Sequence, residues 1–250
     1  MNNYIKLTNN LETLKLYEIK NRLESVIERN NQGSINFTDG LYELTERELE
    51  YQKERAKVAL VKVANFPFQK TFNDFDFNFQ PLINRQEMLD LKYLKFINNN
   101  ENILFVGPPG VGKTHLATAV GIESALNRIS TYFISCHDLI LQLKRAHLEN
   151  RLEQRIKHYA SYGVLIIDEV GYLPLDIESS NLLFQLIAKR YERKSTVITT
   201  NKNFSEWGEV FGDAVLANAI LDRLLHHSKV FLIKGRSYRT KDIIKINDSD

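Results

Sequence analysis

The chain has 250 residues, a formal net charge of +2 and an apolar fraction of 43%. This composition predicts a globular protein with a buried core and excludes a disordered or histone-like basic chain. Its one cysteine, Cys136, excludes an intramolecular disulfide. No apolar run reaches the roughly 18 residues of a membrane span, and the N-terminus lacks a signal-peptide core. We therefore expect a cytoplasmic protein with no membrane contact.

Residues 1–66 predict a small helical domain without strands. Apolar residues recur there at spacings of three and four, as on one helix face: Leu16, Ile19, Leu23, Val26 and Ile27. Thr45 and Glu48 stand three residues apart, which is consistent with a capping box. The segment contains ten Lys and Arg residues and ten Asp and Glu residues, so its net charge is zero. These charges indicate a solvated helical face, with a docking domain as the alternative.

Six of the 14 phenylalanines lie in "FPFQKTFNDFDFNFQP", residues 66–81. No helical or strand period fits this stretch, so residues 67–81 are predicted to be an extended linker. Its rings are expected to pack under the domain that follows. The alternative is that one ring lies on an adenine.

From residue 82 to residue 245, strands alternate with helices. This alternation predicts an α/β domain in which helices cover both faces of a parallel sheet. The expected strands are 102–106, 131–135, 163–168, 195–200 and 229–233. The expected helices are 85–98, 113–126, 137–159 in one or two pieces, 178–193 and 214–225.

Residues 107–114, "GPPGVGKT", match the P-loop pattern G-x-x-x-x-G-K-[ST] between an expected strand and an expected helix. Glycines let backbone N–H groups turn toward phosphate oxygens, and the helix N-terminus attracts the same anion. Lys113 is expected to reach the β- and γ-phosphates of ATP, and Thr114 to offer its hydroxyl to Mg²⁺. The predicted nucleotide-binding residues are Gly107, Pro108, Pro109, Gly110, Val111, Gly112, Lys113, Thr114 and His115.

Two later strands are predicted to end in polar groups beside the P-loop. The run "VLIIDE" ends in Asp168 and Glu169. Asp168 is expected to hold Mg²⁺, mostly through water, and Glu169 is expected to activate the attacking water. The alternative is a strand end capped by two solvated acids. Asn201 follows "STVITT" and can reach the γ-phosphate or the water, or serve only as a turn former.

Two arginines near the end of the chain are candidates for phosphate contact. Arg223 lies in a late helix, where it can reach the γ-phosphate of a neighbouring subunit or lie at the surface beside Asp222. Arg239 follows the last strand and can sense phosphate, touch DNA or face solvent.

Other basic residues indicate either DNA contact or a solvated face: the cluster at 189–194, and Lys144, Arg145 and Arg151. His226 and His227 have no partners at metal-ligand spacing, so no structural metal is predicted.

Several stretches together resemble the IstB family of ATP-binding helpers of insertion-sequence transposition: "GPPGVGKTHLATAVG", "LIIDEVGYLPLD", "NLLFQLIAKRYER", "FSEWGEVFGDAVLANAILDRLLHHS" and "GRSYR". The wider group is the AAA+ ATPases, on the branch with the DnaC and DnaI helicase loaders. The resemblance covers nearly the whole chain. It implies a homo-oligomer that forms on duplex DNA, hydrolyses ATP, and recruits or stimulates a partner transposase at the target site.

By motif position, the resemblance implies roles for individual residues. Residues 107–114 correspond to Walker A, and Asp168 and Glu169 to Walker B. Asn201 corresponds to sensor 1, Arg223 to an arginine finger acting in trans, and Arg239 to sensor 2. The helical insertion after the second strand is implied to face DNA, which favours Lys144, Arg145 and Arg151. The N-terminal helices become candidates for contact with the transposase or for self-assembly.

Three alternatives to a transposition ATPase stay open. A helicase loader acting on single-stranded DNA belongs to the same class, although "DEVGYLPLD" and "ILDRLLHHS" favour transposition. A small-molecule kinase would need a mobile basic lid, which no segment fits. An inert nucleotide-binding scaffold is disfavoured by the intact Lys113, Asp168 and Glu169.

Overall fold

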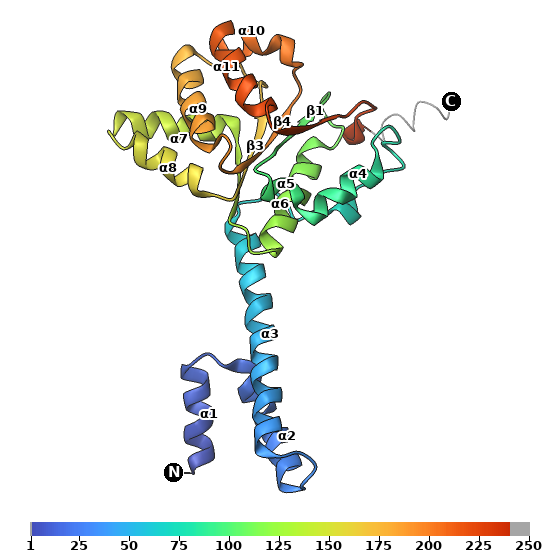
Figure 1. Cartoon of the computed structure of the whole chain (residues 1–250), viewed down its shortest axis with the longest axis vertical. Helices are drawn as coiled ribbons and strands as arrows, with labels where there is room; N and C mark the ends of the chain where they lie inside the picture. Colours follow the sequence, from blue (N-terminus) through green and yellow to red (C-terminus); the bar gives the residue numbers. More distant parts are fainter. Residues whose placement is uncertain (1, 241–250) are drawn as a thin grey trace. The chain divides into compact units, whose positions relative to one another are not determined.

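The computed structural model describes residues 2–240, and the chain divides into two compact units, Met1–Ala59 and Leu60–Asp250 (Figure 1). This division falls inside one long helix, before the boundary expected at residue 66. Residues 241–245 of the expected ATPase domain lie outside the described residues. Among residues 2–240, no helix combines the length and apolarity that a membrane crossing requires.

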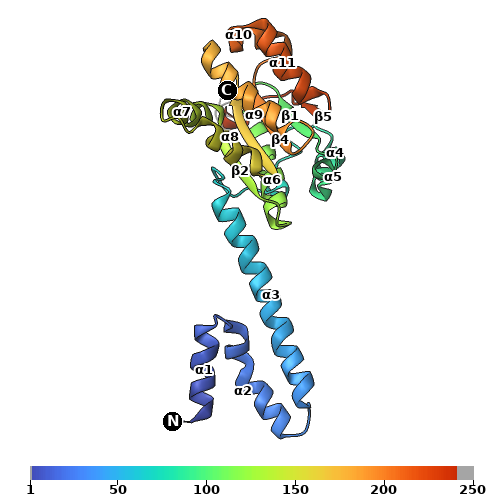
Figure 2. The same ribbon diagram turned by 60° about the vertical axis from the view of Figure 1, so that its left-hand side comes forward.

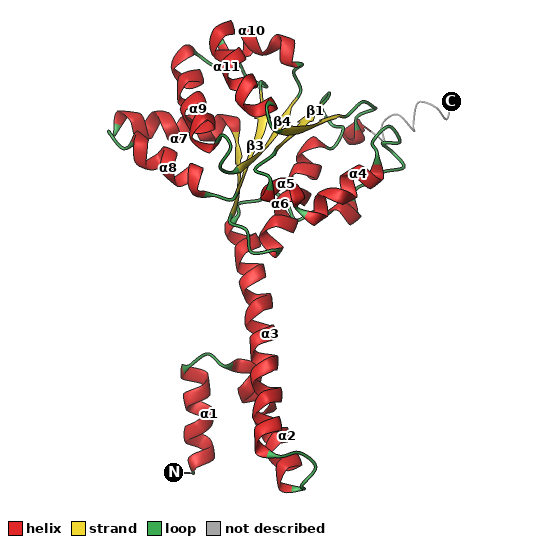
Figure 3. Cartoon of the chain, viewed as in Figure 1, coloured by secondary structure: helices red, strands yellow, loops and turns green. Residues whose placement is uncertain are grey.

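The first unit is helical, as predicted. It contains α1 (Asn3–Thr13), α2 (Tyr17–Asn31) and most of α3 (Phe37–Val63) (Figure 3). A small core joins the three helices through Leu11, Leu23, Val26 and Leu44. Ile27, which the periodicity assigns to the same face as Leu23 and Val26, is exposed instead.

The capping box expected at Thr45 and Glu48 is wrong. Because α3 begins at Phe37, Thr45 lies in the helix interior, where its hydroxyl donates to carbonyl groups one turn earlier. Glu48 is buried, and its Oε2 accepts the backbone N–H groups of Glu18 (2.7 Å) and Ile19 (3.2 Å). Glu48 therefore satisfies free N–H groups in the first turn of α2, a neighbouring helix.

The second unit is built on the predicted parallel sheet. Its strands are β1 (Asn102–Val106), β2 (Thr131–Ser135), β3 (Val164–Val170), β4 (Ser195–Thr200) and β5 (Ser228–Leu232). Their order is β2-β3-β4-β1-β5, and every neighbouring pair is parallel. The carboxyl ends of β1, β3 and β4 therefore meet at one edge of the sheet.

The helices of the second unit are α4 (Arg85–Asp90), α5 (Lys95–Asn98), α6 (Lys113–Leu126), α7 (Cys136–Leu148), α8 (Leu152–Ser161), α9 (Ile177–Arg190), α10 (Trp207–Phe211) and α11 (Ala214–Leu225). The helix expected over 85–98 is interrupted at Leu94, which has a left-handed φ of 54°. The region expected over 137–159 forms two helices, with a left-handed Asn150 (φ 55°) between them.

Helices cover both faces of the sheet (Figure 2), and strand alternation divides its side chains between two cores. In β1, Leu104 and Val106 belong to the core formed with α7, α8, α9, α10 and α11. Phe105 belongs to the core formed with α4, α5 and α6. Both faces are thus apolar, which explains why β1 shows no polar alternation.

The Phe-rich segment packs on the α6 side of the sheet, as expected. Phe72 and Phe75 are buried in that core, and Phe66 and Phe77 pack against it. The segment is not fully extended, because Phe72–Asp74 form a 3₁₀ turn. These four rings belong to the core of the second unit.

Arg190, at the end of α9, is 1% exposed and is surrounded by hydrogen-bond acceptors. Its guanidinium donates to the carbonyl oxygens of Tyr159 (3.0 Å), Tyr162 (2.8 Å) and Ser195 (2.5 Å), and to Oγ1 of Thr196 (3.0 Å). Burial lowers the pKa of Arg190 to about 9. This side chain joins the end of α8 to the start of β4, so neither interpretation of the 189–194 cluster, DNA contact or a solvated face, applies to Arg190.

We expect Arg190→Met to lower the free energy of unfolding by at least about 3 kcal/mol, since each buried acceptor left unpaired costs roughly 1–3 kcal/mol. Urea unfolding followed by circular dichroism measures this loss. Arg193→Met, at an exposed arginine three residues later, is the control and should stay within about 0.5 kcal/mol of wild type. Equal stability of the two variants would contradict the structural role of Arg190.

Candidate nucleotide-binding site

The P-loop connects β1 to α6, and its three glycines, Gly107, Gly110 and Gly112, stand where a side chain would clash. A Cβ atom at Gly107 would lie 2.2 Å from the carbonyl oxygen of Ile233, which follows β5. Gly112 caps α6 with a φ of 99°, and a Cβ there would lie 2.6 Å from the ring of Phe75. The loop is therefore packed between the Phe-rich segment and the end of the chain that the structure describes.

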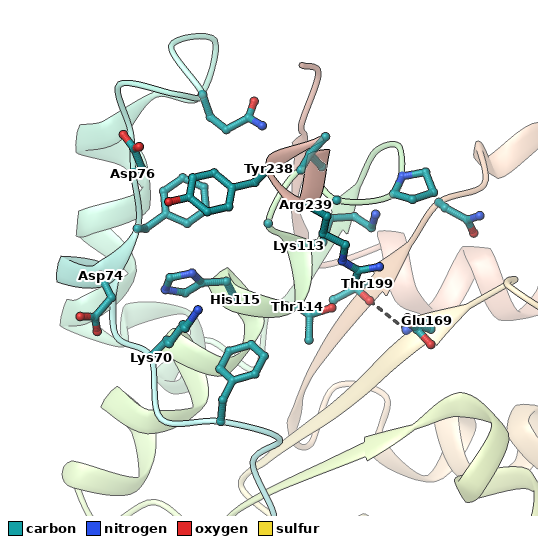
Figure 4. A pocket seen from close by; sticks show the side chains of 18 of the residues that line it. Lys70, Asp74, Asp76, Lys113, Thr114, His115, Glu169, Thr199, Tyr238 and Arg239 are labelled. Carbon is teal, nitrogen blue, oxygen red and sulfur yellow. Dashed lines mark hydrogen bonds between the residues drawn. The ribbon is translucent and has the colours of Figure 1, made fainter. Parts of the chain in front are cut away.

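A cavity of about 430 Å³ opens over this loop (Figure 4). The predicted site residues that line it are Pro109, Gly110, Val111, Gly112, Lys113, Thr114, His115, Glu169, Asn201 and Arg239. Gly107 and Pro108 adjoin it through Lys113, whose Nζ donates to both of their carbonyl oxygens at 2.8 Å. Burial lowers the pKa of Lys113, and Asp168 opposes this shift.

Asp168 is buried at the edge of this cavity and accepts hydrogen bonds from two threonines. Thr114 Oγ1 donates to both carboxylate oxygens at 3.1 Å, and Thr199 Oγ1 donates to Oδ1 at 2.5 Å. A hydroxyl and a carboxylate are the hard oxygen ligands that Mg²⁺ prefers, so Thr114 and Asp168 fit this ion. Burial raises the pKa of Asp168, and the threonine hydrogen bonds oppose the shift. No motif in the sequence indicates this role of Thr199, because its partner lies on another strand.

We expect Asp168→Asn to raise the melting temperature of the nucleotide-free chain at neutral pH. Because burial raises the pKa of Asp168 in the folded chain, the stability that the neutral carboxyl provides at low pH is lost as the pH rises through that pKa. The advantage of the variant should therefore grow as the pH rises from about 4, the ordinary pKa of Asp, through the raised pKa of the folded chain. Thermal unfolding at several pH values tests this, with the exposed Asp90→Asn as control. An advantage that shrinks as the pH rises would contradict the expectation.

Glu169 lies in a bulge within β3, and the expectation that the strand ends at this acidic pair is wrong. The strand continues to Val170, and its register to β4 shifts between Ile167 and Val170. Glu169 has a left-handed φ of 60°, and its N–H donates to Thr199 Oγ1 at 2.9 Å. A bulge redirects the side chain that it carries. The carboxylate of Glu169 is exposed and lines the cavity, whereas Asp168 is buried.

Asn201 follows β4 directly and contributes its side chain to the cavity wall. Its Oδ1 is buried and has no hydrogen-bond partner among the described residues. A buried amide oxygen without a donor is costly, so it favours a ligand or water that can donate a hydrogen bond. This is an unpaired polar group of the kind that a bound nucleotide and its attacking water would satisfy.

The opposite wall comes from the Phe-rich segment and from residues after β5. Figure 4 shows His115 and Tyr238 across the cavity from Glu169. The backbone N–H of Tyr238 donates to the carbonyl oxygen of Gly110 at 2.9 Å. His115 Nε2 lies 2.8 Å from the carbonyl oxygen of Thr71, and burial lowers the pKa of its ring. Phe68 also lines this wall, where an adenine ring could stack on it.

Arg223 does not line the cavity of its own chain. It lies on α11, where its Nη1 donates to the carbonyl oxygen of Ala219 at 2.9 Å and its guanidinium lies 4.7 Å from the ring centre of Phe184. The side chain is only partly buried. Any contact of Arg223 with nucleotide would therefore involve a second copy of the chain or a rearrangement of this one.

The three candidate DNA-binding residues are paired with acids in this structure. Lys144 pairs with Asp176 at 2.7 Å, and Arg145 pairs with Glu149 at 3.0 Å. Arg151 also pairs with Glu149, and these two arginines hold the pKa of Glu149 below its ordinary value. Arg145 and Arg151 line a hollow of about 680 Å³ between α7 and α8. A DNA phosphate there would have to compete with Glu149.

The fold and the site together define an AAA+ protein that binds ATP. A parallel sheet of order β2-β3-β4-β1-β5 carries a P-loop after β1 and an acidic pair in β3. The family of IstB-like ATP binding proteins matches residues 9–245, and the chain belongs to that family. The family and the fold predicted from the sequence are thereby confirmed.

Relatives of this chain match it over nearly its full length. It is 53% identical over 241 residues to the insertion sequence IS232 ATP-binding protein of Bacillus thuringiensis, and this match covers 96% of each chain. It is 42% identical over 232 residues to the insertion sequence IS21 ATP-binding protein of Pseudomonas aeruginosa, covering 93% of this chain and 88% of that one.

Solved structures share the fold at low sequence identity. DnaA from Aquifex aeolicus, bound to AMPPCP, matches with a TM-score of 0.58 and 16% identity over 74% of this chain and 56% of that one. The DnaC helicase loader matches with a TM-score of 0.54 and 24% identity over 70% of this chain and 98% of that one. At these identities, the similarity concerns the fold alone.

Proposed function

We propose that this chain is an ATPase that assembles on duplex DNA and assists transposition by recruiting or stimulating a partner transposase. The observation that carries the ATPase assignment is the convergence of Lys113, Thr114, Glu169 and Asn201 on one cavity, with Asp168 at its edge. The transposition assignment is supported by near full-length relatives that are named as proteins of insertion sequences.

In the proposed reaction, water attacks the γ-phosphorus of ATP and the bond to the β–γ bridging oxygen breaks. Glu169 takes a proton from the water, and Asn201 orients that water through its unpaired Oδ1. Lys113 releases the P-loop carbonyls and stabilises the charge on the β- and γ-phosphates. Mg²⁺, held by Thr114 and Asp168, would neutralise phosphate charge when bound.

The site is completed by a second subunit in this proposal. Arg223 lies away from the cavity of its own chain on a partly exposed helix, which suits an arginine that reaches a neighbour's γ-phosphate. ATP then stabilises contact between subunits, and hydrolysis weakens it. Arg239 lines the cavity beside Lys113, where it can sense the phosphates of its own chain.

DNA contact is proposed for α7 and α8, through Lys144, Arg145 and Arg151. A helix pair with several arginines around a hollow can bind phosphates, provided that the ion pairs with Glu149 and Asp176 open. Because these pairs are exposed, they stabilise the chain little and can exchange at low cost.

The first experiment is light scattering on a sizing column with ADP or with a non-hydrolysable ATP analogue. Each nucleotide is tested alone, with duplex DNA and with single-stranded DNA. We expect a large assembly only with the ATP analogue and duplex DNA. Assembly on single-stranded DNA alone would favour a helicase loader instead, and a monomer under every condition would contradict the proposal.

A further inference from the structure

Three side chains outside the nucleotide-binding site gather just past the ends of α9 and α11. They are Glu192, after α9, and His226 and His227, after α11. One ligand atom from each lies within 4.8 Å of the others, and among residues 2–240 no other three His, Cys, Asp or Glu side chains meet in this way. The spacing of these residues along the chain predicts no metal, because Glu192 is distant from the two histidines in the sequence.

The distances within this group suit a shared metal ion. Oε1 of Glu192 lies 3.6 Å from Nδ1 of His226 and 3.5 Å from Nε2 of His227. Both separations are longer than a strong hydrogen bond. They are close to the roughly 3.3 Å that separates two ligands of one tetrahedral Zn²⁺, given metal–ligand distances of about 2.0–2.1 Å.

We propose that Glu192, His226 and His227 bind one divalent transition-metal ion of the zinc class. Two imidazoles and one carboxylate suit Zn²⁺, Co²⁺ or Ni²⁺, whereas Mg²⁺ and Ca²⁺ prefer oxygen ligands alone. Each of the three side chains is about half exposed, so the ion can enter from solvent and keep a water ligand. None of the three lines the nucleotide cavity.

Metal binding at this site has two structural consequences. The Tyr191 hydroxyl lies 2.6 Å from His226 Nδ1, so the ion must displace this hydrogen bond. The ion would also link the turn after α9 to the end of α11, the helix that carries Arg223 in its last turn. The bound ion would thus restrict the movement of the end of α11, whether or not Arg223 acts in trans.

The test is calorimetric titration of the tag-free, full-length chain, without nucleotide, with ZnCl₂ in excess MgCl₂. We expect one Zn²⁺ per chain, and we expect Glu192→Gln and His227→Ala to weaken binding at least about tenfold. Tyr191→Phe should bind several-fold more tightly, since Nδ1 of His226 is then free. The control is His147→Ala, at an exposed histidine on α7, which should bind as wild type does.

Circular dichroism establishes that each variant is folded before titration. Absence of saturable Zn²⁺ binding by the wild-type chain would overturn the proposal. So would equal affinity of the wild type and His227→Ala, because the metal would then bind elsewhere. Replacement of Zn²⁺ by Co²⁺ adds a spectroscopic signal, and loss of that signal in His227→Ala alongside the loss of affinity would support the assignment.

Discussion

Glu169→Gln is expected to lower the rate of ATP hydrolysis by about 100- to 10,000-fold, the contribution typical of a general base. The bulge in β3 places the Glu169 carboxylate on the cavity wall. The backbone N–H of Glu169 donates to Thr199 Oγ1. Glutamine has nearly the same shape but cannot accept the proton of the attacking water. Phosphate release at saturating ATP measures the loss.

The same variant should keep its affinity for ATP, because Lys113, Thr114 and Asp168 remain intact. Binding of a fluorescent ATP analogue tests this directly. Glu178→Gln, at an exposed glutamate in the first turn of α9, is the matched control and should hydrolyse ATP at the wild-type rate. A Glu169→Gln chain that still turns over ATP within a few-fold of wild type would rule out Glu169 as the base.

Arg223→Ala is expected to lower hydrolysis by about 1,000-fold or more, as for other arginines that complete a neighbour's site. It should leave ATP affinity of the isolated chain unchanged, because Arg223 does not line its own cavity. Within residues 2–240, the guanidinium makes one hydrogen bond, to Ala219, and packs on the ring of Phe184, so its loss should not unfold α11. Arg193→Ala, at an exposed arginine, is the control.

A mixing experiment separates action in trans from action within one chain. Lys113→Ala removes phosphate binding, and Arg223→Ala removes the proposed finger, so each variant alone should be inactive on DNA. An equal mixture should recover up to about a quarter of the wild-type rate, since random assembly completes about one interface in four. A mixture as inactive as its components would contradict the trans arrangement and the ATP-dependent bridge between subunits.

The parts of the site that sequence predicts are those whose residues are neighbours in the chain. The P-loop carries its glycines, Lys113 and Thr114 within eight positions of "GPPGVGKT". The loop lies between strand β1 and helix α6, as the P-loop pattern predicts. Asp168 is found in the same way, because it follows an apolar run. These patterns are local, so they can be identified in the sequence without knowing how the segments pack.

Other predictions failed where a distant segment changed the role of a residue. Glu48 lies at the spacing of a local cap, yet it bonds the start of α2. Arg190 lies in a run of basic residues, yet four backbone carbonyl groups and a threonine hydroxyl hold it inside the fold. In both cases, burial beside a partner far along the chain outweighed the local pattern.

By itself, the sequence determined the α/β class, the order of strands and helices, the nucleotide-binding loop and the family. Only the tertiary structure decided that Thr199 holds Asp168, that a bulge turns Glu169 into the cavity, and that Glu192 meets His226 and His227. The reason is that periodicity and motif spacing describe the chain over one element at a time. Contacts between elements depend on strand order and register, which bring together residues that no local pattern connects.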